Sequence, residues 1–115
     1  MYGPQDTHVR VGDGIELRVR EHLPARGADD APPFLLVHGL ASNALLWDGV
    51  GAALAAAGHR SVAVDLRAHG RSAGSDELSF DRIVDDLARV VAHTGLEHPV
   101  AVGQSWGGNV VLELA

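Results

Sequence analysis

Cysteine and lysine are both absent from the 115-residue sequence, and aromatic residues make up only 4% of it. Without cysteine, the chain cannot form a disulfide, a thiolate metal site or a cysteine nucleophile. All nine basic residues are arginines that stand singly along the sequence, and the net charge is -6. Because nucleic-acid binding needs clustered cationic side chains, we expect no nucleic-acid partner.

Long hydrophobic runs are also missing. No run approaches the ~18 apolar residues that a membrane span requires, and the first residues lack the basic start and apolar run of a signal peptide. We therefore expect a cytoplasmic protein with no membrane partner. Hydrophobic residues still make up 46% of the chain and charged residues only 21%, which is enough apolar surface for the core of one domain.

Two kinds of strand are predicted. Apolar residues alternate with polar ones near 8–11 and 15–22, and the Gly12-Asp13-Gly14 segment between them indicates an antiparallel hairpin. Three later segments are apolar without alternation, as is typical of parallel strands covered on both faces. They are Phe34–Val37, Ser61–Val64 and Val100–Val102.

Two apolar stripes with helical spacing lie between these strands, and a last helix is predicted to begin near Ser105. The first stripe ends at Gly58, and the second begins after Ser79, a possible N-cap, and ends near Gly95. Their members are Leu46, Val50, Ala53, Leu54 and Ala57, then Phe80, Ile83, Val84, Leu87, Val90 and Val91. Alternating strands and helices predict an α/β fold, with a mainly parallel sheet and helices on both faces.

The segment Gly103-Gln104-Ser105-Trp106-Gly107 places a G-x-S-x-G motif directly after a predicted strand and directly before a predicted helix. A serine at such a sharp turn stands clear of the sheet, and side chains at 103 and 107 would collide, which favours glycine at both positions. Backbone N–H groups at the start of the helix favour negative charge on a substrate. Ser105 is therefore the predicted nucleophile.

A second motif, His38-Gly39-Leu40, follows the predicted strand Phe34–Val37. With the serine motif, it makes the chain resemble the N-terminal part of the α/β-hydrolase fold. The resemblance implies that the backbone N–H groups of Leu40 and Trp106 form the oxyanion hole. It also implies that His38 braces the loop, with Gly39, Gly103 and Gly107 in supporting positions.

A third match to this family is the segment from Asp65 to Ser72, to which we assign no catalytic role. We expect Asp65, Arg67 and His69 to bind loop amides and one another. Trp47 is predicted to be a packing residue. No metal is expected, because no ligand spacing such as H-E-x-x-H occurs.

The other triad members are missing from the sequence. In this fold the order is Ser, then Asp or Glu, then His, but no histidine follows Ser105. Glu113 is the only later carboxylate, and ~12 Å of helical rise separates it from Ser105. We therefore expect residues 1–115 to be an incomplete, N-terminal part of a single hydrolase domain. Alone, this chain is expected to be inactive and to fold poorly, with an exposed strand edge at 99–103.

The predicted function is that of a serine hydrolase acting on a small-molecule carboxylic ester or related acyl compound. No cofactor is expected, because an activated serine and an oxyanion hole suffice for acyl transfer. Carbon–carbon bond hydrolases, cofactor-free haloperoxidases or perhydrolases and proline iminopeptidase-like peptidases remain alternatives. A non-catalytic ligand-binding or receptor protein is an alternative of another class. The substrate, the cap and the oligomeric state stay open.

Overall fold

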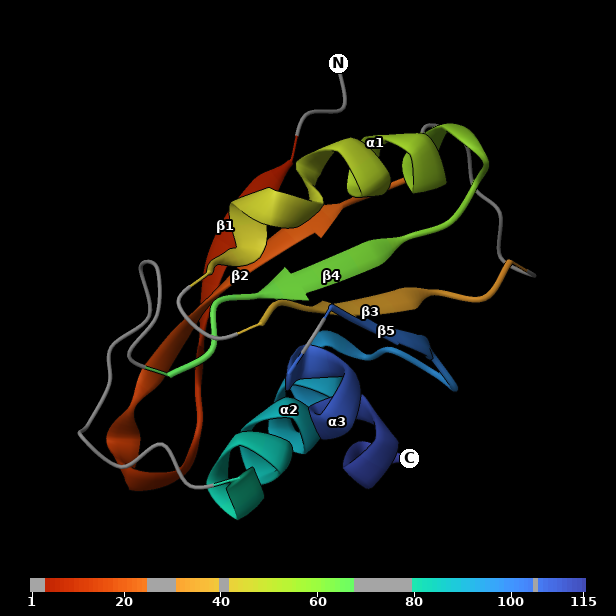
Figure 1. Ribbon diagram of the computed structural model, residues 1–115. Helices are drawn as coiled ribbons and strands as arrows, with labels where there is room; N and C mark the ends of the chain where they lie inside the picture. Colours follow the sequence, from red (N-terminus) through yellow and green to blue (C-terminus); the bar gives the residue numbers. More distant parts are fainter. Residues whose placement is uncertain (1–3, 25–30, 40–41, 68–79, 105) are drawn as a thin grey trace.

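The computed structural model describes residues 4–24, 31–39, 42–67, 80–104 and 106–115. One five-stranded sheet, in the order β1-β2-β4-β3-β5, runs through the molecule (Figure 1). β1 pairs antiparallel with β2, and β2 antiparallel with β4, whereas β3 pairs parallel with both β4 and β5. The strands are Gln5–Arg10 (β1), Glu16–His22 (β2), Phe34–Val37 (β3), Ser61–Val64 (β4) and Val100–Gly103 (β5). The predicted α/β class and hairpin are confirmed.

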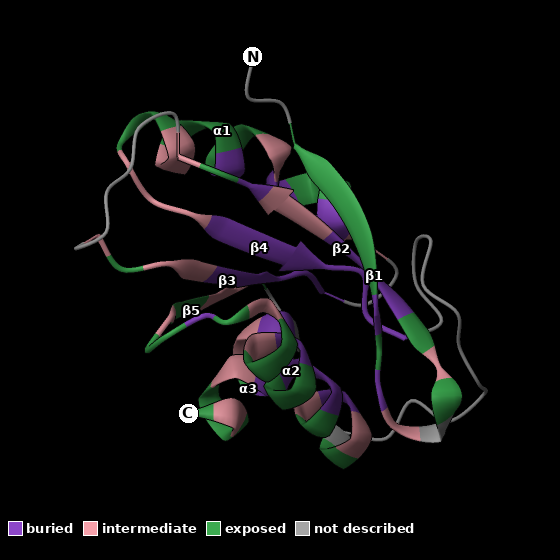
Figure 2. Ribbon diagram, turned by 180° about the vertical axis from the view of Figure 1, so that it is seen from behind, coloured by how far each residue is buried: buried purple, intermediate pink, exposed green. Residues whose placement is uncertain are grey.

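Helices cover both faces of this sheet (Figure 1). α1 (Asp48–Ala56), preceded by a 3-10 turn at Ala44–Trp47, lies on one face, and α2 (Phe80–Thr94) and α3 (Trp106–Leu114) lie on the other. Alternate residues of the parallel strands therefore enter two different cores. Leu35, Val37, Val62 and Val64 belong to the cluster on the α2 and α3 side, whereas Leu36 and Ala63 pack with Ala44 and Trp47. This two-sided burial explains why the strands are apolar without alternation (Figure 2).

The hairpin differs from its prediction in two details. β1 begins at Gln5 rather than near 8, because its ladder with β2 starts at the Gln5–Glu21 pair. Only Val9 is buried in that strand, so the apolar pattern of the sequence does not mark its first residues. The connection is a 3-10 turn at Gly12–Gly14, closed by a 2.8 Å hydrogen bond from the Val11 N–H to the Ile15 carbonyl. Gly14 has a φ of 70°, which explains the glycine there.

The apolar face predicted for the first helix is confirmed only in part. Leu54 packs against the buried cluster on this side of the sheet, but Leu46 and Val50 are 49% and 43% exposed. Leu46 lies in the 3-10 turn before the helix, which shifts the phase of the side chains, so that Ala44, Trp47 and Gly51 are buried instead. Gly51 is required there, because a Cβ atom would lie 2.5 Å from Nδ1 of the His22 ring.

The apolar face predicted for the second helix is confirmed, since Ile83, Leu87 and Val90 are fully buried on α2. A buried ion pair fixes the same helix to the loop after β4. The Arg67 guanidinium donates from Nε and Nη2 to the two carboxylate oxygens of Asp86, at 2.7 and 2.8 Å. Arg67 therefore binds a carboxylate on a helix, a partner that we did not expect from the sequence.

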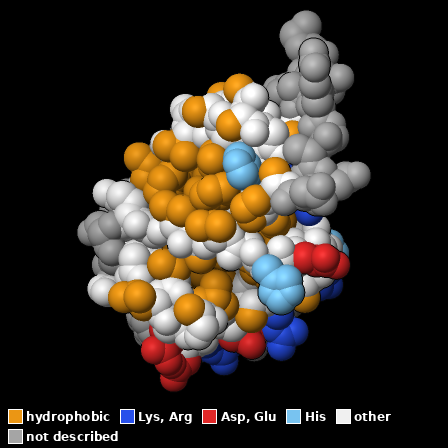
Figure 3. All heavy atoms as spheres, turned by 90° about the vertical axis from the view of Figure 1, so that its right-hand side faces the viewer, with side chains coloured by type: hydrophobic (Ala, Val, Ile, Leu, Met, Phe, Trp, Pro, Cys, Tyr) orange, Lys and Arg blue, Asp and Glu red, His pale blue; other side chains and the backbone are white. Residues whose placement is uncertain are grey.

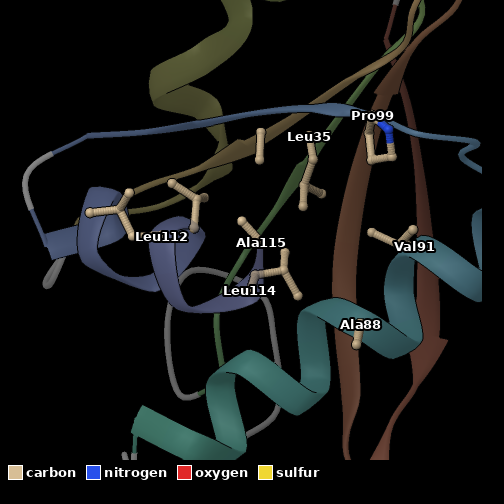
Figure 4. A pocket seen from close by; sticks show the side chains of 9 residues that line it. Leu35, Ala88, Val91, Pro99, Leu112, Leu114 and Ala115 are labelled. Atoms are coloured by element: carbon tan, nitrogen blue, oxygen red, sulfur yellow. The ribbon is translucent and has the colours of Figure 1, made fainter.

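Strand β5 lies at the edge of the described sheet, and hydrophobic side chains gather on this side of the molecule (Figure 3). Val100 is 41% exposed and Leu112 on α3 is 77% exposed. Behind them, an apolar groove of about 540 Å³ opens between β5, α2 and α3 (Figure 4). Pro99 and Ala115 line the groove, which places it at the amino-terminal end of β5, away from the strand end that leads to Ser105.

The buried pair predicts a large difference between two neighbouring aspartates on α2. Asp86→Asn leaves the Arg67 charge without its carboxylate in the interior, and we expect a loss of about 3–5 kcal/mol in the free energy of unfolding. Asp85→Asn is the matched control, because the Asp85–Arg89 pair is solvent-exposed and its loss should have no measurable effect. Urea unfolding of the polypeptide that carries residues 1–115 would check both. Equal effects of the two substitutions would contradict the expectation.

Candidate active site

The topology brings two loops together at one edge of the sheet. β3 lies between β4 and β5, and it leads to α1 on one face, whereas β5 leads to α3 on the other face (Figure 1). Such a reversal opens a crevice at the carboxyl ends of the two strands, where open α/β sheets bind ligands. Because Val37 pairs with Gly103, His38-Gly39 and Gln104 leave the sheet side by side.

The turn between β5 and α3 is tight, as the motif predicts. β5 ends at Gly103 and α3 begins at Trp106, with the Gly107 N–H donating to the Gln104 carbonyl at 3.0 Å. A Cβ atom on Gly103 would overlap the Gly107 carbonyl, so the expected collision between the two positions is present. A Cβ atom on Gly107 would lie 2.5 Å from the Val37 carbonyl oxygen and 2.6 Å from that of His38. Glycine at 107 thus lets the start of α3 touch the loop after β3.

The buried side chain of His38 holds the loop after β3 in place. The ring is fully buried, its Nε2 accepts the Leu66 N–H at 3.0 Å, and its Nδ1 lies 2.5 Å from the Gly39 carbonyl oxygen. Since Nε2 accepts, Nδ1 carries the hydrogen and donates it to Gly39. His38 therefore connects the loop after β3 to the loop after β4.

Asp65 fixes the far end of the same loop. One of its carboxylate oxygens accepts the Ala44 N–H at 2.6 Å, and the other accepts Nε of Arg18 at 2.7 Å. Both side chains are buried, so the ion pair is shielded from water. Asp65 thus binds a loop amide, as we expected of it.

The Arg18 guanidinium also reaches the surface of the hairpin, where it binds Asp6 at 3.1 Å. Asp6 binds Arg20 at 2.9 Å as well. Burial alone would raise the pKa of Asp6, but the hydrogen bond and charge of Arg20, together with Arg18, lower it below its ordinary value. A lowered carboxyl pKa adds stability above the ordinary pKa, and this contribution is lost as the pH falls through the folded-state pKa.

Gln104 joins the two loops through its side chain. Its N–H donates to the Val37 carbonyl at 3.1 Å, and its side-chain oxygen accepts the Gly39 N–H at 3.3 Å. Sequence reasoning treated Gln104 only as a spacer in the serine motif. Gln104 and His38 each come just after a predicted parallel strand. If these two strands are neighbours, that position places Gln104 beside the His38-Gly39 segment.

Several predicted residues lie outside what the structure describes. These are Leu40, His69 and Ser105, so the nucleophile role of Ser105 and the oxyanion role of the Leu40 N–H stay predictions. Trp47 is 8% exposed and packs against Leu36 and Ala63, which confirms its packing role. Within the described ranges, no group of three His, Asp or Glu side chains could hold a metal ion. None of the described helices is long and apolar enough to cross a membrane.

Residues 32–115 match a family model described as the alpha/beta hydrolase fold. The chain belongs to the α/β-hydrolase family. A crystal structure of an alpha/beta hydrolase from Novosphingobium aromaticivorans superposes with a TM-score of 0.89 at 28% identity, covering 100% of this chain and 40% of that one. The antiparallel hairpin and parallel core are thus those of an α/β hydrolase.

Curated relatives of this chain carry different activities. A haloalkane dehalogenase of Psychrobacter cryohalolentis is 34% identical over 98% of this chain, which spans 38% of that protein. A bifunctional esterase/perhydrolase of Acinetobacter calcoaceticus is 34% identical over 90% of this chain, which spans 37% of that protein. The chain therefore spans little more than a third of the length of these relatives.

The contacts of the glycines in the turn between β5 and α3 predict opposite effects of alanine substitution on stability at positions 107 and 108. Gly103→Ala and Gly107→Ala force a methyl group into backbone atoms, and each should cost at least about 1–3 kcal/mol of stability. Gly108→Ala is the control, because its nearest neighbour would be the Gly103 oxygen at 3.8 Å. In helix α3 that change should stabilise the protein by roughly 0.5–1 kcal/mol. Thermal and urea unfolding would measure all three; destabilisation by Gly108→Ala to the same degree would contradict this reading.

Asp65 is predicted to act in stability rather than in the chemistry, since it binds Arg18 and the Ala44 N–H. In the polypeptide that carries residues 1–115, Asp65→Asn should lower the free energy of unfolding by about 1–3 kcal/mol, because Arg18 loses its buried charged partner and keeps the partly exposed Asp6. Turnover per correctly folded molecule should fall much less. A large loss of turnover at an unchanged melting temperature would show that Asp65 takes part in the chemistry.

Proposed function

We propose that residues 1–115 are the N-terminal part of a single serine hydrolase domain that acts on carboxylic esters or related acyl compounds. Ser105 is the nucleophile of this proposal, and the N–H groups of Leu40 and Trp106 bind the oxyanion. The observation that carries it is the junction of the two loops. Gly107 lies against the His38 carbonyl, and Gln104 holds the Gly39 amide, so the turn that bears Ser105 and the loop that bears Leu40 start from one place.

The hydrogen bond from His38 to the Gly39 carbonyl supports the role of Leu40. A trans peptide group is planar, and its C=O and N–H point in opposite directions. A side chain that fixes the Gly39 carbonyl therefore also fixes the N–H on the other side of that peptide group, which is the proposed donor. Preorganised donors of this kind stabilise the tetrahedral intermediate without reorganisation during the reaction.

His38 is a poor candidate for the general base, because both of its ring nitrogens are engaged. Nε2 accepts the Leu66 N–H, and Nδ1 donates to Gly39. Taking a proton from Ser105 would require a free lone pair on the ring. We propose that the base and its acidic partner come from the polypeptide outside residues 1–115, in the order of the family.

The serine itself favours acyl substrates over alkyl halides. If a serine hydroxyl displaced a halide from carbon, the product would be an alkyl ether, which offers water no carbonyl to attack. Attack on an ester instead releases an alcohol and leaves an acyl-serine, and water then hydrolyses this ester to the acid. Of the two curated relatives, the esterase/perhydrolase is thus the better guide to this chain, although both share its fold.

Perhydrolysis is a second candidate, favoured by the name of that relative. The same acyl-serine would be attacked by hydrogen peroxide in place of water and would release a peracid. Peracid formation from an acetate ester and hydrogen peroxide, measured beside hydrolysis of the same ester, separates the two functions.

The nucleophile is tested by Ser105→Ala in the full polypeptide. We expect hydrolysis of p-nitrophenyl acetate and butyrate to fall by at least about 10⁴-fold with little change in stability, because the acyl-serine cannot form. A fluorophosphonate probe should label the wild-type protein on Ser105, as mass spectrometry of the tryptic peptides would show. Gln5→Met, on the outer strand β1, is a surface control that should keep full activity. Retained turnover in the alanine variant would overturn the proposed function.

A further inference from the structure

We propose that Gln104 is a positioning residue of the oxyanion loop, which acts by holding the Gly39 amide with its side-chain oxygen. The inference rests on the proposed function, because the loop matters to catalysis only if Ser105 is acylated. Gln104 itself needs no contact with the substrate for this role. It is the residue directly before the nucleophile, so it couples the position of the turn to the position of the loop.

Two backbone hydrogen bonds hold Gln104 itself. Its N–H donates to the Val37 carbonyl, and its own carbonyl accepts the Gly107 N–H. Its backbone is thus tied to the end of β3 and to the first turn of α3. A side chain on such a fixed backbone can place its oxygen reproducibly, although the residue is exposed.

The Gly39 amide is used by the protein itself rather than left for a substrate. The Gly39 N–H is 3.3 Å from the Gln104 oxygen, so it is already bound and does not point at a substrate. His38 binds the carbonyl of the same residue. Side chains therefore hydrogen-bond both the N–H and the C=O of Gly39: Gln104 binds the N–H and His38 binds the C=O. These bonds fix the orientation of the two peptide groups that flank Gly39.

Glycine at 39 has no side chain to limit its backbone. Glycine populates more of φ/ψ space than any other residue, so external contacts must select its conformation. Without Gln104, the peptide group between His38 and Gly39 loses one of its fixed ends. A misplaced oxyanion donor then weakens binding of the transition state more than binding of the substrate.

Gln104→Met tests this, because methionine has similar length but its thioether is a weak acceptor. In the full polypeptide we expect kcat for p-nitrophenyl butyrate to fall about 10- to 100-fold, with KM within about twofold of wild type. The inhibition constant of phenylboronic acid, whose serine adduct is tetrahedral, should rise by a similar factor. Gln5→Met is the matched control, since the same substitution on β1 should change none of these values.

A measurement that needs no catalysis accompanies the kinetics. Hydrogen exchange of the Gly39 amide, followed by NMR, should be at least about tenfold faster in Gln104→Met than in Gln5→Met, because the amide loses its acceptor. The melting temperatures of the two variants should agree. Unchanged Gly39 exchange, a loss confined to KM, or a fall in melting temperature that accounts for the lost activity would each overturn the role of Gln104.

The two proposals fail in different ways. If Ser105→Ala keeps its turnover, the proposed function is wrong whatever Gln104 does. If Ser105→Ala is inactive but Gln104→Met has wild-type kcat and wild-type affinity for the boronic acid, only the positioning role is wrong.

Discussion

The close approach of Gly107 to the end of β3 is the contact on which the arrangement of the site depends. Its Cα lies so near the Val37 and His38 carbonyl groups that no side chain fits between them. This approach places the first turn of α3 against the loop after β3, and the Gly103–Gly107 contact fixes the angle at which the chain leaves β5. A bulkier residue at either position would separate the proposed nucleophile from its oxyanion donors. Glycine's cost in conformational entropy is thus offset by a geometry that no other residue permits.

The loop after β3 is held by polar side chains because a backbone turn at a sheet edge cannot satisfy all its own hydrogen-bonding groups. His38, Gln104 and Asp65 each take one of these groups: the Gly39 carbonyl, the Gly39 amide and the Ala44 amide. Two of the three side chains are buried, so each needs its own partner. Leu66 supplies one to His38 and Arg18 supplies one to Asp65. The loop therefore depends on side chains from the elements around it as well as on its own His38.

The buried parallel strands and the glycine turn after β5 could be predicted from the sequence, because each follows from a short local pattern of residues. The unbroken apolar runs at Phe34–Val37 and Ser61–Val64 report burial on two faces, and the glycines at 103 and 107 report a steric clash. The buried face of α1 could be predicted only at Leu54, since a 3-10 turn before the helix shifts the phase and leaves Leu46 and Val50 exposed. The partner of Arg67 was missed for a different reason. Asp86 is nineteen residues away, and pairings at that separation follow from packing rather than from spacing.

Among the described residues, the hydrogen bonds that hold the loop come from β2, the end of β3, the loop after β4 and the turn before α3. The proposed oxyanion site, fixed in this way, makes no demand on which base serves the nucleophile or on what forms the substrate pocket. Such independence is compatible with relatives of dehalogenase and of esterase/perhydrolase activity that align with this segment at 34% identity. In the proposed function, the scaffold supplies a place where negative charge is stabilised, and the residue at 105 decides whether the covalent intermediate can be hydrolysed. With serine there, an acyl intermediate can be, and an alkyl intermediate cannot.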